Sequence, residues 1–278
     1  MMNIDTFIEH YRAIQFEESK KAYKATCHFI TLENDNPKPF GTGVFTEIDS
    51  NYFMLTAAHV TDEIEIYVRI GNNDILKLGG DLTCNIVANK SERRKDKHDI
   101  SIIKLDNFTY NKIKDIYDFI PKQQLGINHV DIKSQLYSVV GFPASKSKFN
   151  KYKNTIKSSP FIYSTFPEID SIYGELKYNK QFNIIVEFRK ENATNYVTKE
   201  KTVAPDLYGM SGGGLWFVPL PVGQTMDNCV KSLVAIMTDW PTENRNVMIG
   251  TRIDFFTELI RQKYKLELPK SLKINVII

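Results

Sequence analysis

Three short segments of this chain contain residue types that can activate a hydroxyl group for nucleophilic attack. The first is a β-type run, Leu-Thr-Ala-Ala-His, that ends in His59, and the second places Asp99 ahead of an alternating apolar run. The third, Gly-Met-Ser-Gly-Gly over residues 209–213, sets Ser211 among glycines that permit positive φ. A serine becomes nucleophilic when a base takes its proton and a third group orients that base. Each segment alone is common as a turn or cap, but together they predict such a site.

The order of the three residues along the chain separates the folds that build this kind of site. The glycines around Ser211 also fit the Gly-x-Ser-x-Gly turn of α/β-hydrolases, but that fold places its histidine after the serine. No histidine follows His129 in this chain, so this interpretation fails. A subtilisin-like order needs the aspartate ahead of the histidine, and the β-rich pattern opposes it. A phosphate-binding loop of the Walker type is not indicated, because its lysine is missing.

Short strands make up most of the elements that must position these residues. Turn residues separate the β-rich runs, which predicts a closed or sandwiched antiparallel structure. The predicted strands cover residues 26–32, 42–48, 52–57, 64–70, 75–78, 82–88, 100–105, 135–141, 160–165, 182–188, 213–218, 232–237 and 246–251. A polar connection over residues 107–124 separates the two halves.

A helix is expected at each end of the chain. A stripe with helical spacing (Ile4, Phe7, Ile8, Tyr11, Ile14) predicts a helix over residues 3–15, which we expect to dock on the β structure of its own chain. The last helix is predicted over 254–265, with Asp254 as its cap and basic residues in its last turn.

Composition indicates a soluble globular chain with room for one large domain or two small ones. Its 278 residues are 42% hydrophobic and 25% charged, and the net charge of +3 gives no sign of nucleic acid or membrane as a partner. Cys27, Cys84 and Cys229 show no metal-ligand spacing and predict free thiols in a reducing compartment. No apolar run precedes a cleavage site near the start, so we expect a cytoplasmic protein without a signal peptide.

The three motifs resemble those of the chymotrypsin/trypsin-like serine peptidases. The Gly-Thr-Gly-Val-Phe strand at residues 41–45 is similar to the glycine-bearing strand of that family, and the resemblance covers about residues 23–265. It implies an all-β fold of two antiparallel β-barrels with the site in the cleft between them. The domains expected from it are a helical extension (1–22), a first barrel (23–124), a second barrel (125–252) and a helix with a tail (253–278).

The resemblance also implies a role for each matching residue. Ser211 becomes the nucleophile, His59 the general base and then acid, and Asp99 the group that orients the imidazole. The N–H groups of Gly209 and Ser211 form the oxyanion hole.

Substrate contacts are expected at two places in the second half. The substrate backbone would pair as an added strand with the segment that follows the serine, which comprises Ala235, Ile236, Met237 and Thr238. The floor of the primary pocket aligns with Pro205, and Asp206 beside it fits a preference for Arg or Lys. A solvent-facing Pro-Asp turn also fits Asp206, so no residue preference is predicted.

The chain departs from the digestive branch of the family at Met210. There an aspartate before the serine receives a newly released N-terminal ammonium, and a methionine cannot form that ion pair. We therefore expect an enzyme that is ready-made or is switched by a partner or a loop movement.

The function expected is a serine endopeptidase that uses no metal or cofactor. Its expected partners are a protein or peptide substrate and an activating or docking protein, and its expected role is limited proteolysis of an intracellular partner such as a stress or defence effector. The alternatives are a catalytically silent trypsin-like binding scaffold and an esterase with the same triad. The lysine- and aromatic-rich segment 146–153 is expected to be a solvated loop, and the apolar tail 274–278 an edge strand or a partner contact.

Overall fold

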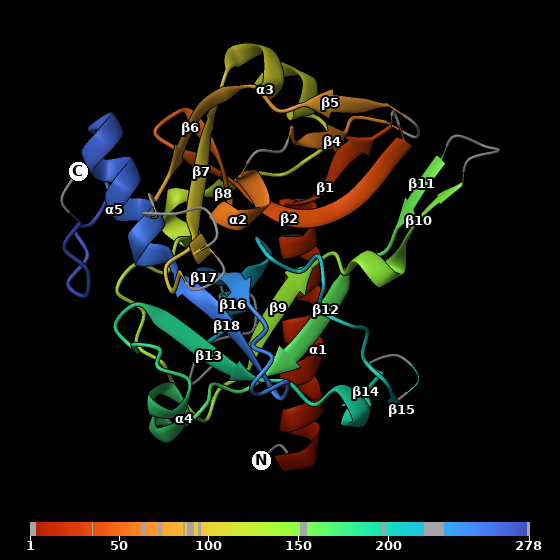
Figure 1. Ribbon diagram of the computed structural model, residues 1–278. Coiled ribbons are helices and arrows are strands. Elements are labelled where there is room, and N and C mark those ends of the chain that lie inside the picture. Colours follow the sequence, from red (N-terminus) through yellow and green to blue (C-terminus); the bar gives the residue numbers. More distant parts are fainter. Residues whose placement is uncertain are drawn as a thin grey trace.

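The strands of the protein gather into two main sheets, which lie one above the other in Figure 1. The structure is a computed structural model that describes residues 4–34, 36–62, 65–71, 74–85, 87, 92–93, 96–150, 155–195, 198, 200–219 and 231–276. The first half of the chain forms an eight-stranded sheet and the second half a six-stranded one. This is the two-part, mainly antiparallel arrangement that the sequence predicts.

The first sheet contains strands β1 to β8 in the order β5-β4-β1-β2-β3-β7-β6, with β8 beside β2. Their bounds are β1 (Thr26–Glu33), β2 (Asn36–Ile48), β3 (Asn51–Ala57), β4 (Tyr67–Arg69), β5 (Ile75–Lys77), β6 (Gly80–Cys84), β7 (Ile100–Leu105) and β8 (Ile120–Pro121). The pairs are antiparallel except for the short β2–β8 contact. The β3–β7 pairing matters most for the site, because it brings the ends of the His59 and Asp99 strands together: Ala57 faces Ile100.

The second sheet follows the order β12-β9-β16-β17-β18-β13. Its strands are β9 (Tyr137–Gly141), β12 (Phe161–Thr165), β13 (Asn183–Glu187), β16 (Gly214–Phe217), β17 (Ser232–Asp239) and β18 (Val247–Arg252). Two small hairpins stand apart from it, namely β10 (Ser147–Asn150) with β11 (Thr155–Ser158) and β14 (Ala193–Thr194) with β15 (Lys201–Thr202). The segment 146–153 was expected to be a loop, and this is wrong for residues 147–150, which form β10. Its residues 151–153 lie outside the described residues.

The helices are α1 (Ile4–Lys24), α2 (Ala58–Thr61), α3 (Asn107–Ile113), α4 (Asp170–Glu175) and α5 (Ile253–Tyr264). Figure 1 shows α1 running along the second sheet and up to the first, and α5 at the side of the molecule near β6 and β7. Helix α3 lies inside the stretch that was expected to be only a polar connection. Its N-terminus is capped by the Asp106 carboxylate, which accepts a hydrogen bond from the Thr109 N–H.

Helix α1 is longer than the apolar stripe in the sequence predicts. Its buried face continues through the polar residues Gln15 and Ser19 to Ala22, so a pattern of apolar residues alone ends too early. Tyr11 is buried and its hydroxyl donates to the Val218 carbonyl at 2.9 Å. The helix therefore docks on the second half of its own chain, as expected.

The start of α5 corrects the expectation for Asp254. The N-cap residue is Arg252 and carries no side-chain cap bond, so the predicted capping role is wrong. Asp254 is instead buried in the first turn, where its carboxylate accepts from the Asn128 N–H and the Ser271 hydroxyl. A buried carboxylate with two donors fixes the chain before β9 and the chain after α5 to the same helix end.

One apolar cluster is shared by both sheets and by α5. Leu55 and Ile102 enter it from the first sheet, Trp216 and Ile236 from the second, and Phe256 from the helix. All five are buried, and full burial of a large apolar side chain contributes about 1.5–3 kcal/mol. This shared core holds the two sheets against each other.

A buried ion pair links the end of β18 to the loop before β9, and removing its cation should be costly. The Arg252 guanidinium lies 2.8 Å from both carboxylate oxygens of Asp131 and also donates to the carbonyls of Lys180 and His129. Arg252→Met leaves the Asp131 carboxylate buried without its partner, and we expect the free energy of unfolding to fall by about 3–5 kcal/mol. Urea unfolding measures this.

The matched control for Arg252→Met is Arg12→Met, on the exposed face of α1, which should change the free energy of unfolding by less than about 0.5 kcal/mol. Adding Asp131→Asn to Arg252→Met should recover part of the loss, since it removes the stranded charge. A loss below about 1 kcal/mol for Arg252→Met would show that water reaches Asp131 and replaces its partner.

Candidate active site

His59 is presented by the short helix α2 immediately after β3. The Ala57 residue at the end of β3 keeps extended backbone angles, and α2 begins at Ala58, so the chain turns sharply and His59 projects from a rigid base. Ala58 is buried, whereas the His59 side chain keeps 36% of its surface exposed. The two alanines ahead of the histidine thus serve as predicted, since their small side chains let the turn pack closely.

Asp99 approaches His59 through an unusual backbone conformation just before β7. Its φ of 48° lies in the left-handed region, which is uncommon for residues with a side chain and costs about 1 kcal/mol or more. The conformation directs Asp99 Oδ2 to within 2.5 Å of His59 Nδ1 and lets Oδ1 accept from the His59 backbone N–H at 2.9 Å. The carboxylate is buried. Both of its oxygens therefore bind the same residue, which fixes the position of the imidazole and the proton on its Nδ1.

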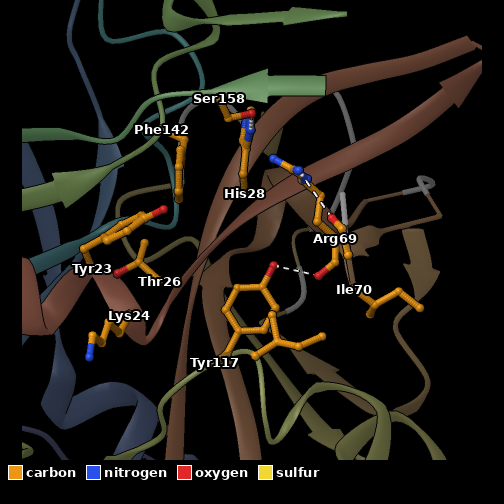
Figure 2. A pocket seen from close by; sticks show the side chains of 11 residues that line it. Tyr23, Lys24, Thr26, His28, Arg69, Ile70, Tyr117, Phe142 and Ser158 are labelled. Carbon is orange, nitrogen blue, oxygen red and sulfur yellow. Dashed lines mark hydrogen bonds between the residues drawn. The ribbon is translucent and has the colours of Figure 1, made fainter. Parts of the chain in front are cut away.

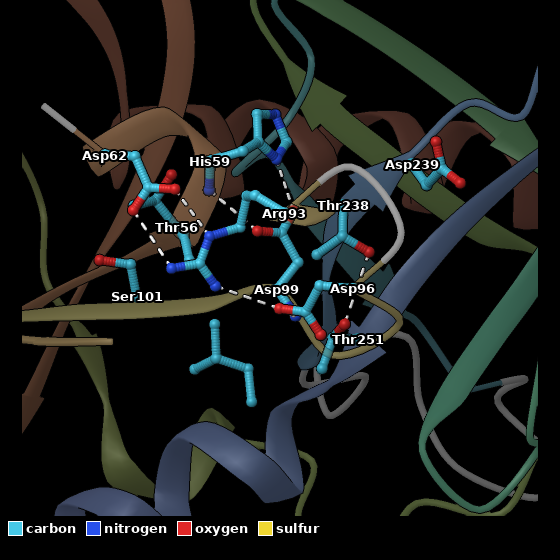
Figure 3. Close-up of polar contacts among 12 residues, drawn as sticks. Thr56, His59, Asp62, Arg93, Asp96, Asp99, Ser101, Thr238, Asp239 and Thr251 are labelled. Atoms are coloured by element: carbon cyan, nitrogen blue, oxygen red, sulfur yellow. Dashed lines mark hydrogen bonds and ion pairs between the residues drawn. The ribbon is translucent and has the colours of Figure 1, made fainter. Parts of the chain in front are cut away.

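A second group of charged residues holds the Asp99 loop in this conformation (Figure 3). Asp96 accepts hydrogen bonds from the backbone N–H groups of His98 and Asp99. Arg93, which is buried, bonds to Asp96 at 3.2 Å and to Asp62, just after α2, at 2.7 Å. The Arg93 guanidinium thereby ties the histidine helix to the aspartate loop. Nothing in the sequence pattern singled out these three residues, because their pairing depends on contacts between separate loops.

The electrostatics of the site favour the protonated form of His59. Burial is the largest single influence on the His59 pKa and lowers it, but the hydrogen bond and negative charge of Asp99 work in the opposite direction. The charges of Asp239 and Asp62 add to that effect, and the net pKa of His59 lies above its ordinary value. A histidine with a raised pKa can accept a proton as a general base and then donate it as a general acid.

The Ser211 loop depends on two glycines with positive φ. Gly209 has a φ of 92° and Gly212 a φ of 88°. Gly212 also lies against the first sheet, where an added Cβ would stand 1.8 Å from the Thr42 carbonyl oxygen and 2.1 Å from the Thr56 hydroxyl. Only glycine fits this position. The loop of the second half is thus pressed onto β2 and β3, close to the end of β3 that presents His59.

Thr42 of β2 connects the two halves at this point. Its N–H donates to the Ser211 carbonyl at 2.9 Å, and its hydroxyl donates to the Gly209 carbonyl at 2.9 Å. Its own carbonyl accepts from the Thr56 hydroxyl at 2.7 Å. Thr42 belongs to the predicted glycine-bearing strand, but its role as the hydrogen-bond link between β3 and the serine loop was not predicted.

The backbone N–H groups of Gly209 and Ser211 remain unbonded in the part of the chain that the structure describes. Those of Met210, Gly212 and Gly213 donate to the carbonyls of other residues. The carbonyl of Tyr208 accepts from the Ala144 N–H, and that of Met210 accepts from the Gly213 N–H. Because a peptide unit is planar and trans, these contacts turn the N–H groups of Gly209 and Ser211 the opposite way. The two N–H groups that the resemblance assigns to the oxyanion hole therefore have no other partner among the described residues.

The Ser211 hydroxyl makes no hydrogen bond within the described ranges, and the His59 ring bonds there to Asp99 alone. Hydrogen bonds between a nucleophile and its base are commonly long in unliganded enzymes and tighten when substrate binds. The structure thus pairs His59 with Asp99 and brings the serine loop onto the same strands.

The predicted substrate-binding strand must be shifted along β17. Ala235 and Ile236 pair with β16 on one side and with β18 on the other, and the N–H and carbonyl of Met237 bond to Gly213 and Gly212. The assignment of these three residues to an added strand is wrong, because both of their edges are occupied. Pairing with β16 ends before Thr238, so Thr238 and Asp239 have no strand on that side among the described residues.

Pro205 and Asp206 lie beside a buried apolar cluster. Ala204 and Leu207, which flank them, are buried in this cluster with Phe188. Asp206 is exposed and pairs with the Lys190 ammonium at 2.8 Å. The solvent-facing turn is therefore the interpretation of Asp206 that its contacts favour, and the carboxylate is already engaged with a cation.

Among the residues that the structure describes, no group of three or more His, Cys, Asp and Glu side chains is placed to hold a metal ion. No helix within those ranges is both long and apolar enough to cross a membrane. Cys27 and Cys84 are free thiols, and Cys229 lies outside the described residues.

Comparisons with known proteins give matches at the level of structure. No protein-family model and no curated protein matches the sequence. Neuropsin, a serine protease from mouse brain, superposes with a TM-score of 0.55 at 15% identity, covering 88% of this chain and 96% of neuropsin. A structure described as GrC gives a TM-score of 0.53 at 16% identity, with the same coverage. The HtrA-type protease AlgW gives 0.50 at 14% identity, covering 91% of this chain and 64% of AlgW.

The chain therefore has the fold of the chymotrypsin/trypsin-like serine proteases. Its two antiparallel half-barrel sheets, with a helix at each end, correspond to the fold class that the sequence predicts, and that prediction is confirmed. Because the identities are 16% or lower, these matches show the fold alone.

Removing the negative charge at the end of β17 should shift the pH dependence of this site. The Asp239 carboxylate accepts from the Tyr178 hydroxyl at 2.5 Å, and its charge raises the His59 pKa. If His59 is the general base, as the resemblance implies, only the neutral ring takes the proton, and activity should be lost as pH falls through this pKa. Asp239→Asn destabilises the imidazolium and lowers the pKa, and activity should persist to lower pH. The acid limb of kcat/KM against pH measures the shift.

Asp206→Asn is the control for this measurement, since Asp206 is exposed and its carboxylate is paired with the Lys190 ammonium. An unchanged or higher acid-limb pKa in Asp239→Asn would show that the Asp239 charge does not reach the imidazole.

Proposed function

We propose that the protein is a serine endopeptidase that cleaves a protein substrate through an acyl-enzyme. The main support is the pairing of His59 Nδ1 with the Asp99 carboxylate at 2.5 Å. It fixes the tautomer in which His59 Nε2 can accept a proton from Ser211. The unbonded N–H groups of the serine loop supply the second requirement, which is a pair of donors for the oxyanion. A binding scaffold needs neither feature.

In the proposed reaction, Ser211 Oγ attacks the carbonyl carbon of the scissile peptide while His59 Nε2 takes the hydroxyl proton. Asp99 stabilises the imidazolium, and the N–H groups of Gly209 and Ser211 bind the oxyanion. The imidazolium then gives its proton to the amide nitrogen, the C–N bond breaks and the amine product leaves. Water that loses a proton to His59 attacks the ester on Ser211, which releases the carboxylic acid and restores the enzyme.

The substrate backbone is proposed to pair with the free edge of β17 from Thr238 onward. An extended peptide there would gain main-chain hydrogen bonds and pass beside Asp239 on its way to Ser211. The substrate is thus still expected to bind as an added strand. It pairs beyond Ala235, Ile236 and Met237, whose backbone groups are already bonded within the protein.

The proposed setting is limited cleavage of a dedicated intracellular partner in the cytoplasm. The free thiols Cys27 and Cys84 suit a reducing compartment. Met210 is 4% exposed and lies in an apolar cluster, which suits a serine loop that does not depend on an ion pair with a released N-terminus.

Labelling with a fluorophosphonate probe tests the proposed function. The wild-type protein should be labelled, and Ser211→Ala and His59→Ala should not, because the first removes the nucleophile and the second its base. Ser134→Ala, which changes an exposed serine outside the site, should be labelled like the wild type. Cleavage of an unfolded protein substrate is measured in parallel.

The outcomes separate the alternatives. Labelling that depends on both residues, together with peptide-bond cleavage, supports the endopeptidase. Labelling with turnover of acyl esters but without peptide cleavage indicates an esterase. A folded wild type that is not labelled, with or without added partner proteins, indicates a silent scaffold and overturns the proposal.

A further inference from the structure

A cavity of about 370 Å³ lies between the two halves of the molecule (Figure 2). Tyr23 and Lys24 at the end of α1 line it, as do His28 of β1 and Arg69 of β4. Phe142, directly after β9, completes the wall from the second half. The volume falls in the range of sites for small molecules. None of these residues belongs to the proposed catalytic machinery.

His28 lines this cavity and is itself almost fully buried. The side chain is 3% exposed, its Nδ1 lies 2.8 Å from the Ser158 hydroxyl, and its ring stacks on Phe142 with centroids 4.8 Å apart. The Nε2 atom is buried and has no hydrogen-bond partner among the described residues. Leaving such a group unpaired costs about 1–3 kcal/mol. Burial, followed by the charge of Arg69, lowers the His28 pKa to about 4, so the ring is neutral at pH 7.

The charged side chains among the described residues that line the cavity are positive. Arg69 and Lys24 bring two cations to its wall, and none of its described lining residues is an aspartate or glutamate. Figure 2 shows the Arg69 guanidinium beside the His28 ring. Tyr23, Phe142 and Tyr117 add aromatic rings to the wall, and the ring centroids of Tyr23 and Phe142 lie 5.8 Å apart. A flat apolar group would pack on these rings while an anionic group faced the cations.

We propose that this cavity binds a small aromatic anion, a ring bearing one carboxylate or phosphate group. The positive charges of Arg69 and Lys24 attract the anionic group, and the ring packs against Phe142 and Tyr23. The carboxylate and phosphate forms share this chemistry, and the test below distinguishes them.

The cavity is coupled to the serine loop through the chain after β9. The Phe142 N–H donates to the Thr42 hydroxyl at 3.0 Å, and that hydroxyl donates to the Gly209 carbonyl. Two residues further on, the Ala144 N–H holds the Tyr208 carbonyl at 2.7 Å, which orients the Gly209 N–H. A ligand that packs on Phe142 therefore holds the oxyanion donor in its working direction. This coupling rests on the proposed function, whereas the binding site itself does not.

Binding is tested by calorimetry and thermal unfolding with phenyl phosphate and benzoate, using benzyl alcohol as the neutral counterpart. At least one anion should bind saturably and raise the Tm, and benzyl alcohol should not. Arg69→Met should weaken binding about 10- to 100-fold through loss of a charged hydrogen bond. Arg12→Met, a change at an exposed arginine of α1, should bind like the wild type.

Two further readouts separate binding from catalysis. Binding is repeated in Ser211→Ala, where it should be unchanged, and the His28 pKa is followed by NMR, where a bound anion should raise it. With the wild type, the bound anion should speed fluorophosphonate labelling about fivefold or more. Saturable binding without faster labelling overturns the coupling to the serine loop but supports the binding site. If the protein is not labelled in any condition, that result counts against the proposed function alone. No saturable binding of either anion, or equal binding by Arg69→Met, overturns the site.

Discussion

Replacing Asp99 by asparagine is expected to lower kcat/KM about 10⁴-fold while leaving the protein folded. The two carboxylate oxygens of Asp99 both accept from His59, one from the backbone N–H and one from Nδ1. Asparagine has only one acceptor oxygen. If that oxygen keeps the bond to the backbone N–H, the amide NH₂ faces Nδ1 and forces it to accept. The ring proton then moves to Nε2, which can no longer take a proton from Ser211.

Peptidase assays and far-UV circular dichroism of Asp99→Asn measure this effect, with Asp115→Asn as the control. Asp115 is an exposed aspartate in the turn after α3, and its substitution should leave kcat/KM within about twofold of the wild type. A folded Asp99→Asn enzyme that loses less than about tenfold would show that the imidazole is oriented by other groups. Activity of Asp99→Asn that rises again at higher pH would instead agree with a ring proton held on the wrong nitrogen, Nε2.

The second large effect is expected from Gly212→Ala. A Cβ at this position would stand 1.8 Å from the Thr42 carbonyl oxygen, and the φ of 88° is itself unfavourable for alanine. The serine loop must then move away from β2 and β3, which breaks the bonds that Thr42 makes to it. We expect a loss of about 3 kcal/mol or more in the free energy of unfolding and loss of fluorophosphonate labelling.

Gly174→Ala is the matched control for this prediction. Gly174 lies in α4, and a Cβ there meets nothing within 4 Å. An alanine in a helix is more favourable than glycine by about 0.5–1 kcal/mol, so this change should be neutral or stabilising. Gly212→Ala with wild-type stability and labelling would contradict the close contact between the serine loop and the first sheet.

The strands of the fold were predictable because their apolar residues alternate or run continuously between turns. The run 100–105 is predicted with the bounds that β7 has, and most other strands differ by one to three residues at an end. The hairpin of β10 and β11 was missed because its lysines and polar residues give no buried-strand pattern. Helix α1 was predicted too short because Gln15 and Ser19 are buried polar residues.

The site was predictable only as far as local motifs reach. His59, Asp99 and Ser211 lie in segments whose small or alternating neighbours mark them, and the contact of the first two is as expected. The added-strand assignment failed at Ala235 and Ile236, since sequence does not say which edges of a strand are already paired. Thr42, Arg93 and Asp239 escaped notice, because threonines, arginines and aspartates are common and their contacts here join distant parts of the chain.

The burial of Met210 has a consequence for how the serine loop responds to temperature. Its thioether packs near Gly141, and the side chain is 4% exposed in an apolar cluster. An ion pair at this position would weaken with salt and with the titration of its partners. Apolar burial has little dependence on either, but it carries a large heat-capacity change and weakens on cooling. The part of the loop's stability that Met210 contributes is thus insensitive to pH and ionic strength and decreases on cooling.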